Sequence, residues 1–346
     1  MNVPRPPVAR RAAYVALAVL ICVVVAAMTS VAPAVPPEIR VDRKGLHIPG
    51  VDAASPIVYD NDWWSDVFDN NYLWAQAHLG RADLRANVVT RDMWDHPNYK
   101  YPMARCMEDA RQALDLARQS GLRNLPDLTT GSDRVLDPPQ SRNIDDTTVH
   151  PTPGSRLIVA EARKASPEKP LVVVAGGPLT TVANALLEDP SIGPRLVVFA
   201  LAVSSYGYNG KDGWSVYVVA KRTRLVEWAT RAFWKKNEVF APRDFQRLPR
   251  NPFFDDMRRL IQSNLGQVNQ LGDGAPLVWL FDNRCWTGAV NRRAVFDGRA
   301  TNFPEGQPAD VLSVPRKHTD FRRMRDAFFR VMSDPRLAKT TEDATR

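Results

Sequence analysis

Cysteine and histidine are scarce in this chain of 346 residues, which contains three cysteines and five histidines. Cys22 lies in an apolar run near the start, so only Cys106 and Cys285 remain for the rest of the chain. Two cysteines cannot form a disulfide framework, and this excludes the small domains that several disulfides hold together. The two could still pair with each other in an oxidising compartment, and the sequence leaves this pairing open.

Acidic residues are absent from the first 37 positions. Three arginines there precede the apolar run Ala12–Met28, and the small residues Ala32–Ala34 follow it. This order is typical of a secretory signal peptide, although the run is also about as long as the shortest membrane-spanning helices. We therefore predict that residues 1–34 are a signal peptide or an N-terminal membrane anchor. Either one would place the rest of the chain outside the cytoplasm, exported or anchored to the membrane.

A clustered basic patch is also missing, although the net charge of the whole chain is +8. The excess positive charge is dispersed in short pairs such as Lys221-Arg222 and Arg322-Arg323. Proteins that bind nucleic acid usually gather their basic residues on one face, so we expect no nucleic-acid partner. The chain is long enough to bury a sizeable core. Its sequence leaves open whether it forms a homo-oligomer.

Three segments follow the predicted leader. Residues 35–55 are rich in proline, glycine and charge, which is typical of a linker. From residue 56 onward short apolar runs alternate with amphipathic stretches, so we expect one domain over residues 56–335. Residues 336–346 are expected to form a polar tail. No internal repeat is visible.

The alternation of apolar and amphipathic stretches predicts an α/β fold, with a mostly parallel open sheet and helices on both faces. Strands are expected at Ile57–Tyr59, Asn87–Thr90, Leu171–Ala175, Leu196–Leu201, Ser215–Val219 and Leu277–Phe281. Helices are expected at Met103–Ser120, Arg156–Lys164, Leu179–Leu187, Arg224–Lys235, Phe254–Asn264 and Thr319–Met332. The stretch Thr129–Pro153 is typical of a long loop, and such loops often carry function.

Four aspartates lie within ten residues after the first of these strands: Asp60, Asp62, Asp66 and Asp69. Because the apolar run Ile57–Tyr59 leads directly into them, we expect them at the carboxyl end of a buried strand, where open α/β sheets bind ligands. Carboxylates this close repel one another and need a cation or a shared proton. Oxygen ligands of this kind suit Ca²⁺ or Mg²⁺. A solvated acidic turn is the plainer alternative.

A second stretch also combines an apolar strand with a polar turn. The valine run of Leu171–Ala175 is typical of a strand buried on both faces, and Gly176, Gly177 and Pro178 follow it. The two glycines predict a tight turn, and the proline suits the first turn of a helix. This turn would lie at the same edge of the sheet as the aspartates. By itself it is an ordinary connection between a strand and a helix.

Together the two stretches resemble the nucleoside hydrolases of the inosine–uridine type. That family shows the motif D-x-D-x-x-x-D-x-D-D after its first strand, which the four aspartates match, with Phe68 in place of another aspartate. It later shows Gly-Pro-Leu-Thr-Asn-x-Ala, which Gly177–Thr180 matches, with Thr181 in place of the asparagine. The resemblance runs from about Pro56 to about Asp282.

The resemblance implies a Ca²⁺ site. In the family the aspartates at the positions of Asp62 and Asp69 bind the ion, together with a backbone carbonyl that would belong to Gly176. The last ligand is an aspartate from a later strand end, for which Asp282 after the run Leu277–Phe281 is the best candidate. The implied reaction is hydrolysis of the N-glycosidic bond of a nucleoside or a related small ribosyl compound. In this reaction Asp62 would take a proton from water as the general base.

The sugar-binding part of the family pattern is matched less well than the metal-binding part. The family's Glu-Phe-Asn stretch has no clear copy; Ser215 stands where the asparagine should be, and Trp214 before it could stack on a base or a sugar ring. A family asparagine after the second strand corresponds to Asp92. We expect Asp66 to contact the substrate as well, and Asp60 to support the cluster.

Two other interpretations stay open. Phe68 and the missing Glu-Phe-Asn stretch favour a non-catalytic protein that binds metal or sugar without turnover. The stretch Gly272–Gly274, taken with Asp60 and Asp62, is instead similar to the loops of haloacid-dehalogenase-like phosphohydrolases, which use Mg²⁺. A plain turn would also explain Gly272–Gly274. The phosphohydrolase interpretation leaves the stretch Gly176–Thr181 without a role.

Overall fold

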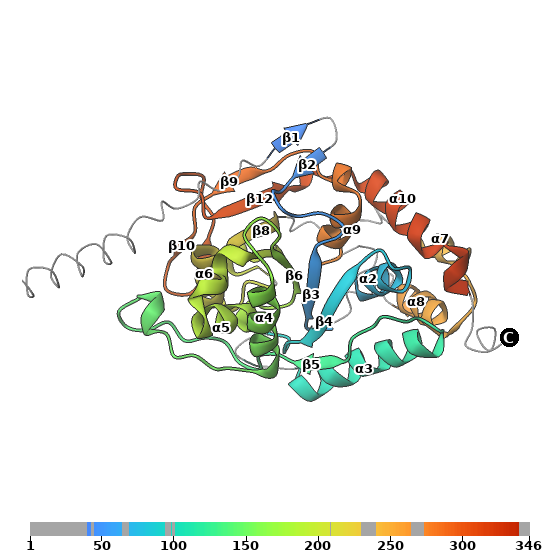
Figure 1. Cartoon of the computed structure of the whole chain (residues 1–346), viewed down its shortest axis with the longest axis horizontal. Coiled ribbons are helices and arrows are strands. Elements are labelled where there is room, and N and C mark those ends of the chain that lie inside the picture. Colours follow the sequence, from blue (N-terminus) through green and yellow to red (C-terminus); the bar gives the residue numbers. More distant parts are fainter. Residues whose placement is uncertain are drawn as a thin grey trace, which may run out of the picture. The chain divides into compact units, whose positions relative to one another are not determined.

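An eight-stranded sheet runs through the unit Ile39–Arg346 of the computed structural model (Figure 1). Its strands are β3 (Pro56–Asn61), β4 (Asp83–Val89), β5 (Leu128–Thr130), β6 (Leu171–Gly176), β7 (Leu196–Leu201), β8 (Arg224–Ala229), β9 (Val290–Arg292) and β12 (Val311–Pro315). They are arranged in the order β5-β4-β3-β6-β7-β8-β12-β9, and every neighbouring pair is parallel except β12 and β9. The predicted mostly parallel sheet is therefore confirmed.

The structure describes residues 40–42, 45–63, 69–93, 98, 101–207, 209–229, 240–263 and 273–338. The predicted leader, residues 1–34, lies outside these ranges. Within them, no helix is both long and apolar enough to span a membrane. Two small hairpins accompany the main sheet: β1 (Arg40–Asp42) pairs with β2 (Gly45–His47), and β10 (Val295–Phe296) pairs with β11 (Thr301–Asn302).

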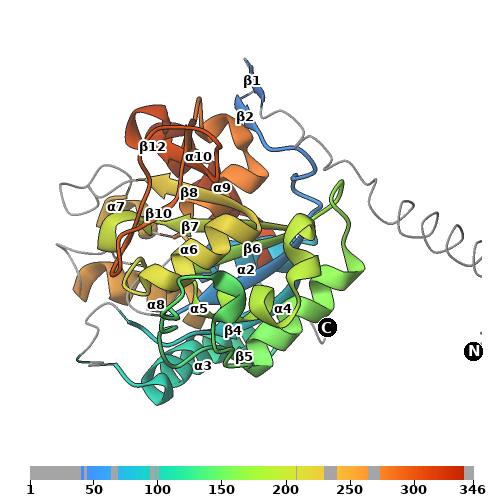
Figure 2. The same cartoon turned by 90° about the vertical axis from the view of Figure 1, so that its left-hand side faces the viewer.

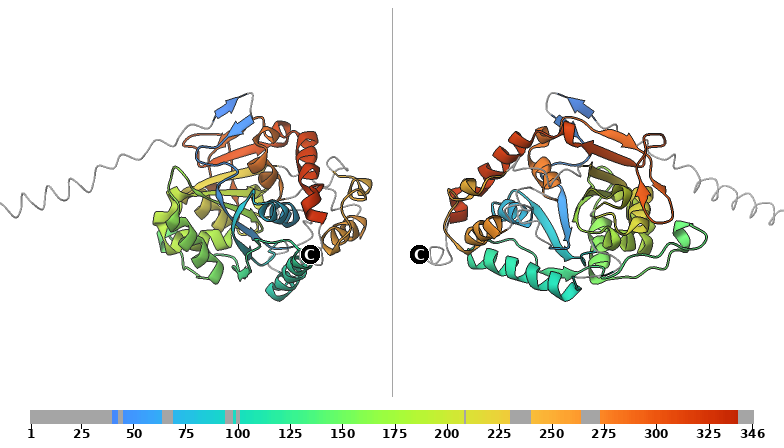
Figure 3. Two further views of the ribbon diagram at one scale, coloured as in Figure 1. Left: turned by 45° about the vertical axis from the view of Figure 1, so that its right-hand side comes forward. Right: turned by 180° about the vertical axis from the view of Figure 1, so that it is seen from behind.

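Helices cover both faces of the sheet, as predicted. They are α2 (Asp69–His78), α3 (Met103–Gln119), α4 (Pro153–Lys164), α5 (Thr180–Glu188), α6 (Gly213–Arg222), α7 (Pro242–Phe245), α8 (Pro252–Ser263), α9 (Ala275–Phe281) and α10 (Phe321–Met332). Helices α4, α5 and α6 pack side by side on one face, and α2, α9 and α10 pack together on the other. Figures 2 and 3 show the same arrangement from other sides.

Alternate residues of the central strands supply the two cores. Val58, Val173 and Val198 pack under α4–α6, whereas Tyr59 and Phe199 pack under α2, α9 and α10. Successive side chains of a strand point to opposite faces, so a strand covered on both faces must be apolar at nearly every position. This explains the continuous valine runs of β6 and β7, which are buried throughout.

Three predicted elements were wrong in type. The expected strand Ser215–Val219 lies in helix α6, because Asp212 accepts a hydrogen bond from the Ser215 backbone and caps a helix there. The expected strand Leu277–Phe281 is helix α9, which is apolar because six of its seven residues are buried. The expected helix Arg224–Lys235 contains strand β8, which pairs with β7 and β12; residues 230–235 lie outside the described ranges.

The folded unit begins before residue 56, within the predicted linker. Leu46 is fully buried, its backbone nitrogen donates to the Trp286 carbonyl at 2.8 Å, and its carbonyl accepts from Trp279 Nε1 at 3.2 Å. At the other end, Leu337 is buried in the same core, although the sequence placed it in a polar tail. In a short segment of mixed composition, a single buried residue such as Leu46 or Leu337 forms no periodic pattern that would mark it as part of the core.

The two cysteines that follow the leader are both free and buried. Cys106 packs with Val89 and Ala110, whereas Cys285 belongs to the large core under α9 and α10. The pairing that the sequence left open is therefore not made in this structure.

We predict that Leu46→Ala lowers the free energy of unfolding of the domain by about 2–4 kcal/mol, because it leaves a cavity in the core to which Leu46 belongs. The matched control is Val295→Ala, since Val295 is 37% exposed and should change stability by less than about 0.5 kcal/mol. Urea unfolding followed by tryptophan fluorescence measures both. An unchanged midpoint for Leu46→Ala would mean that residues 45–48 are a linker after all.

Candidate functional site

The carboxyl end of β3 is the centre of the candidate site. This strand lies between β4 and β6, with Asp60 in register with Val88 and Ala175. The three strands are parallel, so their carboxyl ends meet at one edge of the sheet, where open α/β sheets bind their ligands. Asp62 directly follows β3, and Gly176 ends β6. We call this edge the acidic edge.

Asp60 is fully enclosed at the acidic edge. Its side chain is 0% exposed, and among the described residues neither of its carboxylate oxygens has a hydrogen-bond partner. Burial raises the pKa of Asp60 well above its usual 3.8, while the nearby Thr181 hydroxyl lowers it. Burying a carboxylate without compensation is unfavourable. The position therefore favours a proton or a cation close to Asp60.

Two glycines bring β6 close to the end of β3. A Cβ atom added at Gly176 would lie 2.2 Å from Asn61 Nδ2 and 3.1 Å from Asp273 Cβ. One added at Gly177 would lie 3.1 Å from both the Cβ and the backbone nitrogen of Asp62. A larger residue at either position would have to displace these neighbours. The glycine turn therefore sets how closely Asp62 and Asp273 approach the backbone of β6.

Asp273 joins the acidic edge from a distant part of the sequence. It lies just before α9 and is 1% exposed, and its Oδ1 accepts a hydrogen bond from Asn209 Nδ2 at 3.0 Å. Neither residue was among the predicted site residues, because the sequence of Gly272–Gly274 matches a plain turn or a phosphohydrolase loop. A usable signal was Pro276, which is typical of the first turn of a helix and places Asp273 before a helix.

Asp69 and Asp92 come from the segments after β3 and β4. Asp69 is fully buried and begins α2, where a negative charge is favourable. Asp92 lies beside the Cys106 thiol of α3. Burial is the main reason that the pKa of Cys106 is raised to about 11; the charges of Asp62 and Asp92 raise it further, and a hydrogen bond with the Asp92 backbone lowers it. Asp62 and Asp92 are thus both close enough to the Cys106 thiol for their charges to affect its pKa. Asp66 lies outside the described residues.

Asp282 does not join the acidic edge, which corrects its assignment as the last metal ligand. It follows α9, whose seven residues separate it from Asp273 by about 10 Å at 1.5 Å per residue. Its carboxylate forms ion pairs with Arg284 and Arg323, each at 3.0 Å. The error has a simple cause: the apolar run before Asp282 is a helix, so its carboxyl end points away from the edge where the parallel strands end.

Trp214 and Ser215 belong to the first turn of α6. Trp214 is 2% exposed and stacks on Tyr217, and its Nε1 donates to Thr147 Oγ1 at 3.0 Å. It contributes only to the wall of a pocket of about 310 Å³. Ser215 is fully buried and its hydroxyl donates to Asp212 Oδ2. This burial argues against the predicted direct contact of the two side chains with a substrate.

A buried network of hydrogen bonds supports the glycine turn. Thr181 Oγ1 accepts from the Ser132 backbone at 2.9 Å and lies 3.2 Å from Thr90 Oγ1. Thr180 Oγ1 donates to Asp212 Oδ2 at 2.6 Å. Burial raises the pKa of Asp212, and its hydrogen bonds lower it. The two threonines thus tie the turn to the loop after β4 and to the start of α6.

The donor atoms of the acidic edge are those that hard cations prefer: carboxylates of Asp62, Asp69 and Asp273, and the carbonyl of Gly176. Throughout the described ranges, however, no three histidine, cysteine, aspartate or glutamate side chains are grouped closely enough to hold a metal ion. The fit to a cation therefore rests on the enclosed Asp60 carboxylate and on the glycine turn, not on an assembled ligand shell.

No protein-family model and no curated protein matches the sequence. Solved structures do match the fold. A purine-preferring ribonucleoside hydrolase from Gardnerella vaginalis is similar with a TM-score of 0.61 and 14% identity, over 82% of this chain and 99% of that one. A plant nucleoside hydrolase is similar with a TM-score of 0.58 and 12% identity, over 81% of this chain and 99% of that one.

The type III effector protein XopQ, complexed with adenosine diphosphate ribose, is a further match with a TM-score of 0.52 and 12% identity, over 84% of this chain and 95% of that one. At such identities the likeness concerns the fold alone. The chain has the nucleoside hydrolase fold, as the two sequence motifs predicted.

We predict that Asp282→Asn destabilises the protein at neutral pH by about 1–2 kcal/mol, less than a fully buried pair because the arginines are partly exposed. Burial alone would raise the pKa of Asp282, but hydrogen bonds from Arg284 and Arg323 lower it below 3.8. The stabilisation is therefore present above pH 3.8 and lost as the pH falls through the lower folded-state pKa. Thermal unfolding of parent and variant across pH 3–7 should show the two curves converging at the acidic end.

The control for this prediction is Asp133→Asn, since Asp133 pairs with Arg134 at the surface and such pairs contribute little. A stability difference between Asp282→Asn and the parent that stays constant from pH 7 to pH 3 would contradict the assigned ion pairs.

Proposed function

We propose that the protein hydrolyses the N-glycosidic bond of a nucleoside or a related small ribosyl compound, with Ca²⁺ as its cofactor. One observation carries the proposal: the buried residues Asp60, Asp62 and Asp273 lie beside a glycine turn at the carboxyl edge of the sheet, within the nucleoside hydrolase fold. The described residues of the two sequence motifs, Asp60, Asp62 and Gly176–Thr180 among them, belong to β3 and β6 and to the segments that follow these strands. Reaction chemistry in such sheets is expected there.

The residues that would hold the cation are Asp62, Asp69, Asp273 and the carbonyl of Gly176. Asp273 takes the place that the sequence had given to Asp282. A bound Ca²⁺ would lower the pKa of a coordinated water and orient two ribose hydroxyls. Asn209 would keep Asp273 turned towards the edge, since its amide donates to the Asp273 carboxylate.

Asp62 is the proposed general base. It lies at the open end of β3, 7% exposed, whereas Asp60 is enclosed behind it. A carboxylate in this position can accept the proton of the attacking water, and the remaining negative charge favours a positively charged, oxocarbenium-like sugar. Asp60 supports this arrangement from within the sheet, and Asp92 approaches the same edge from the loop after β4.

A ribosyl substrate is supported by two kinds of similar structure. Two of the matching structures are nucleoside hydrolases by name, and a third carries adenosine diphosphate ribose. Nucleosides and adenosine diphosphate ribose both contain a ribose whose anomeric carbon bears a nitrogen base. We propose a free small molecule as the substrate, and no nucleic acid.

A second candidate function is binding of a ribosyl compound without turnover. The observation that favours it is the absence, among the described residues, of three grouped metal-binding side chains. Phe68, which stands at a family aspartate position, points in the same direction. The two candidates share a ligand class and differ only in whether the glycosidic bond is broken.

For the cellular location, we propose that the leader of residues 1–34 exports the domain or anchors it to a membrane. The basis is the arginine-rich start followed by the apolar run and the small residues.

We predict that the parent releases free ribose from members of a nucleoside panel, and that a chelator stops this release. Asp62→Asn should lower kcat by about 10²- to 10⁴-fold, since it removes the general base. Reducing-sugar release measures the rate, and Asp133→Asn is the surface control. Tight ligand binding with no ribose release from any nucleoside would favour the non-catalytic candidate. Release of phosphate from an aryl phosphate in the presence of Mg²⁺ would instead support the phosphohydrolase interpretation.

We further predict that the two aspartates flanking α9 behave differently. Asp273→Asn should weaken Ca²⁺ binding at least about tenfold, because it removes one charged ligand. Asp282→Asn should leave the Ca²⁺ affinity unchanged, because its carboxylate is bound by arginines. Isothermal titration of Ca²⁺ into both variants measures the affinities. Equal loss in both variants would show that our assignment of the last ligand is wrong.

A further inference from the structure

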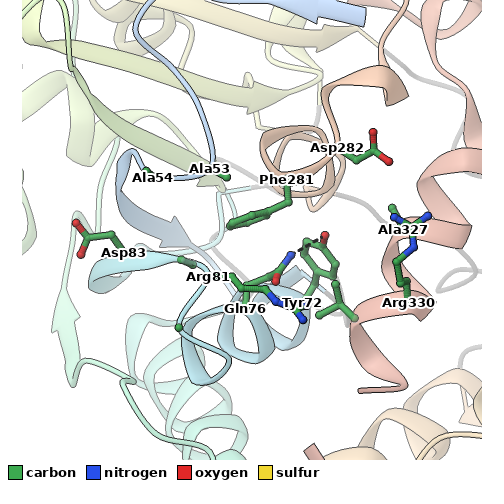
Figure 4. A pocket seen from close by; sticks show the side chains of 13 residues that line it. Ala53, Ala54, Tyr72, Gln76, Arg81, Asp83, Phe281, Asp282, Ala327 and Arg330 are labelled. Atoms are coloured by element: carbon green, nitrogen blue, oxygen red, sulfur yellow. Dashed lines mark hydrogen bonds between the residues drawn. The ribbon is translucent and has the colours of Figure 1, made fainter. Parts of the chain in front are cut away.

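A cavity of about 720 Å³ lies at the opposite edge of the sheet from the acidic edge (Figure 4). Ala53 and Ala54, which precede β3, and Asp83, which begins β4, form one of its sides. The other sides come from α2, the end of α9 and α10. This volume is in the range that binds small organic molecules. Nothing in the proposed hydrolysis uses this cavity.

Gln76 of α2 gives the cavity an unmatched acceptor. The residue is 2% exposed, and among the described residues its Oε1 has no hydrogen-bond partner. Its amide nitrogen donates to the Tyr72 hydroxyl at 3.0 Å. Burial raises the pKa of Tyr72, so the phenol keeps its proton and can donate it onward. A buried carbonyl oxygen without a partner is unfavourable and is rare in proteins, which points to a ligand donor at this position.

The charge that the cavity offers to a ligand is positive. Arg330 of α10 lines it and forms no ion pair with any described residue. The other charged groups are already paired: Arg81 with Asp334 at 3.2 Å, Asp83 with Arg85 at 2.7 Å, and the Asp282 carboxylate with two arginines. Figure 4 shows the Asp282 carboxylate directed away from Gln76. A ligand would therefore meet one cation and one acceptor that have no partner among the described residues.

The remaining wall is largely apolar. Phe281 lies beside Tyr72 in Figure 4, edge to face with 6.1 Å between the ring centroids. Ala327 and Val331 of α10 add to this apolar side. An apolar portion of a ligand would be removed from water here, which adds to the affinity in proportion to the area buried.

We propose that this cavity is a second binding site, for a small organic carboxylate with a hydroxyl or amino donor beside the carboxylate and an apolar tail. The carboxylate pairs with Arg330, the donor satisfies Gln76 Oε1, and the tail packs on Phe281. The site is separate from the acidic edge. Helices α2 and α9 begin with or just after Asp69 and Asp273 at one edge and reach the cavity with Gln76 and Phe281 at the other.

The test uses three probes that differ in one group each: 3-phenyllactate, 3-phenylpropionate without the hydroxyl, and 2-phenylethanol without the carboxylate. Isothermal titration against the full-length protein measures their dissociation constants. We expect 3-phenyllactate to bind at least about tenfold more tightly than either of the others, since each loses one charged or buried hydrogen bond. Equal affinities, or no saturable binding of 3-phenyllactate, would overturn the proposal.

Two variants assign the contacts. Gln76→Met keeps the side-chain length and removes the acceptor, so it should weaken 3-phenyllactate about tenfold and leave 3-phenylpropionate unchanged. Arg330→Gln should weaken both acids and leave 2-phenylethanol unchanged. The matched control is Arg322→Gln, which removes an exposed positive charge from the same helix without touching the cavity. Thermal unfolding of each variant confirms that it is folded.

One more variant separates this site from the acidic edge. Asp62→Asn should leave the affinity for 3-phenyllactate unchanged, whether or not the protein hydrolyses nucleosides. Loss of 3-phenyllactate binding in Asp62→Asn, or an affinity unchanged by Gln76→Met, would place the probe elsewhere and overturn the proposal.

Discussion

Negative charge buried at the end of the central strand is the constraint on which the rest of the site depends. Asp60 is enclosed with both oxygens unmatched among the described residues, and Asp62 and Asp273 are buried close by. Such groups cannot all stay ionised in a protein interior without compensation. The protein must therefore supply a proton or a cation at this edge, where the glycine turn lets Asp62 and Asp273 approach the backbone of β6 closely. The buried hydrogen bonds of Thr180 and Thr181 hold the glycine turn in place and so keep these aspartates close to it.

The parallel sheet explains why these residues meet although they are far apart in sequence. Strands β3, β4 and β6 all end at the same edge, and the helices that follow them start there. Because α2 and α9 run from one edge of the sheet towards the other, the two ends of each helix have different surroundings. Their first turns face the acidic edge, and their last turns reach the cavity that contains Gln76. One pair of helices thus borders two chemically distinct places, one acidic and one with a free positive charge.

The sequence predicted the sheet and the two motifs because both depend on local patterns. A strand buried on both faces needs a continuous apolar run, and its end shows as a change to aspartate or glycine. The same rule failed at Leu277–Phe281 and Ser215–Val219, since a short buried helix is as apolar as a buried strand. Each error affected a candidate residue: Asp282 took the place of Asp273, and Ser215 was expected to contact a substrate from the start of a strand. Periodicity cannot separate the two structures over five residues, whereas the N-cap residue Asp212 and the first-turn proline Pro276 could have done so.

The position of Asp273 also relates the stretch Gly272–Gly274 to the rest of the acidic edge. Gly272–Gly274 first suggested a phosphohydrolase, and that interpretation left the glycine turn of β6 without a role. In the structure Asp273 Cβ would lie 3.1 Å from a Cβ at Gly176, so the stretch and the turn belong to one place. The aspartates after β3, the turn after β6 and the aspartate before α9 then form a single arrangement. A single arrangement that uses all three stretches is a stronger basis for glycosidic chemistry than either motif was alone.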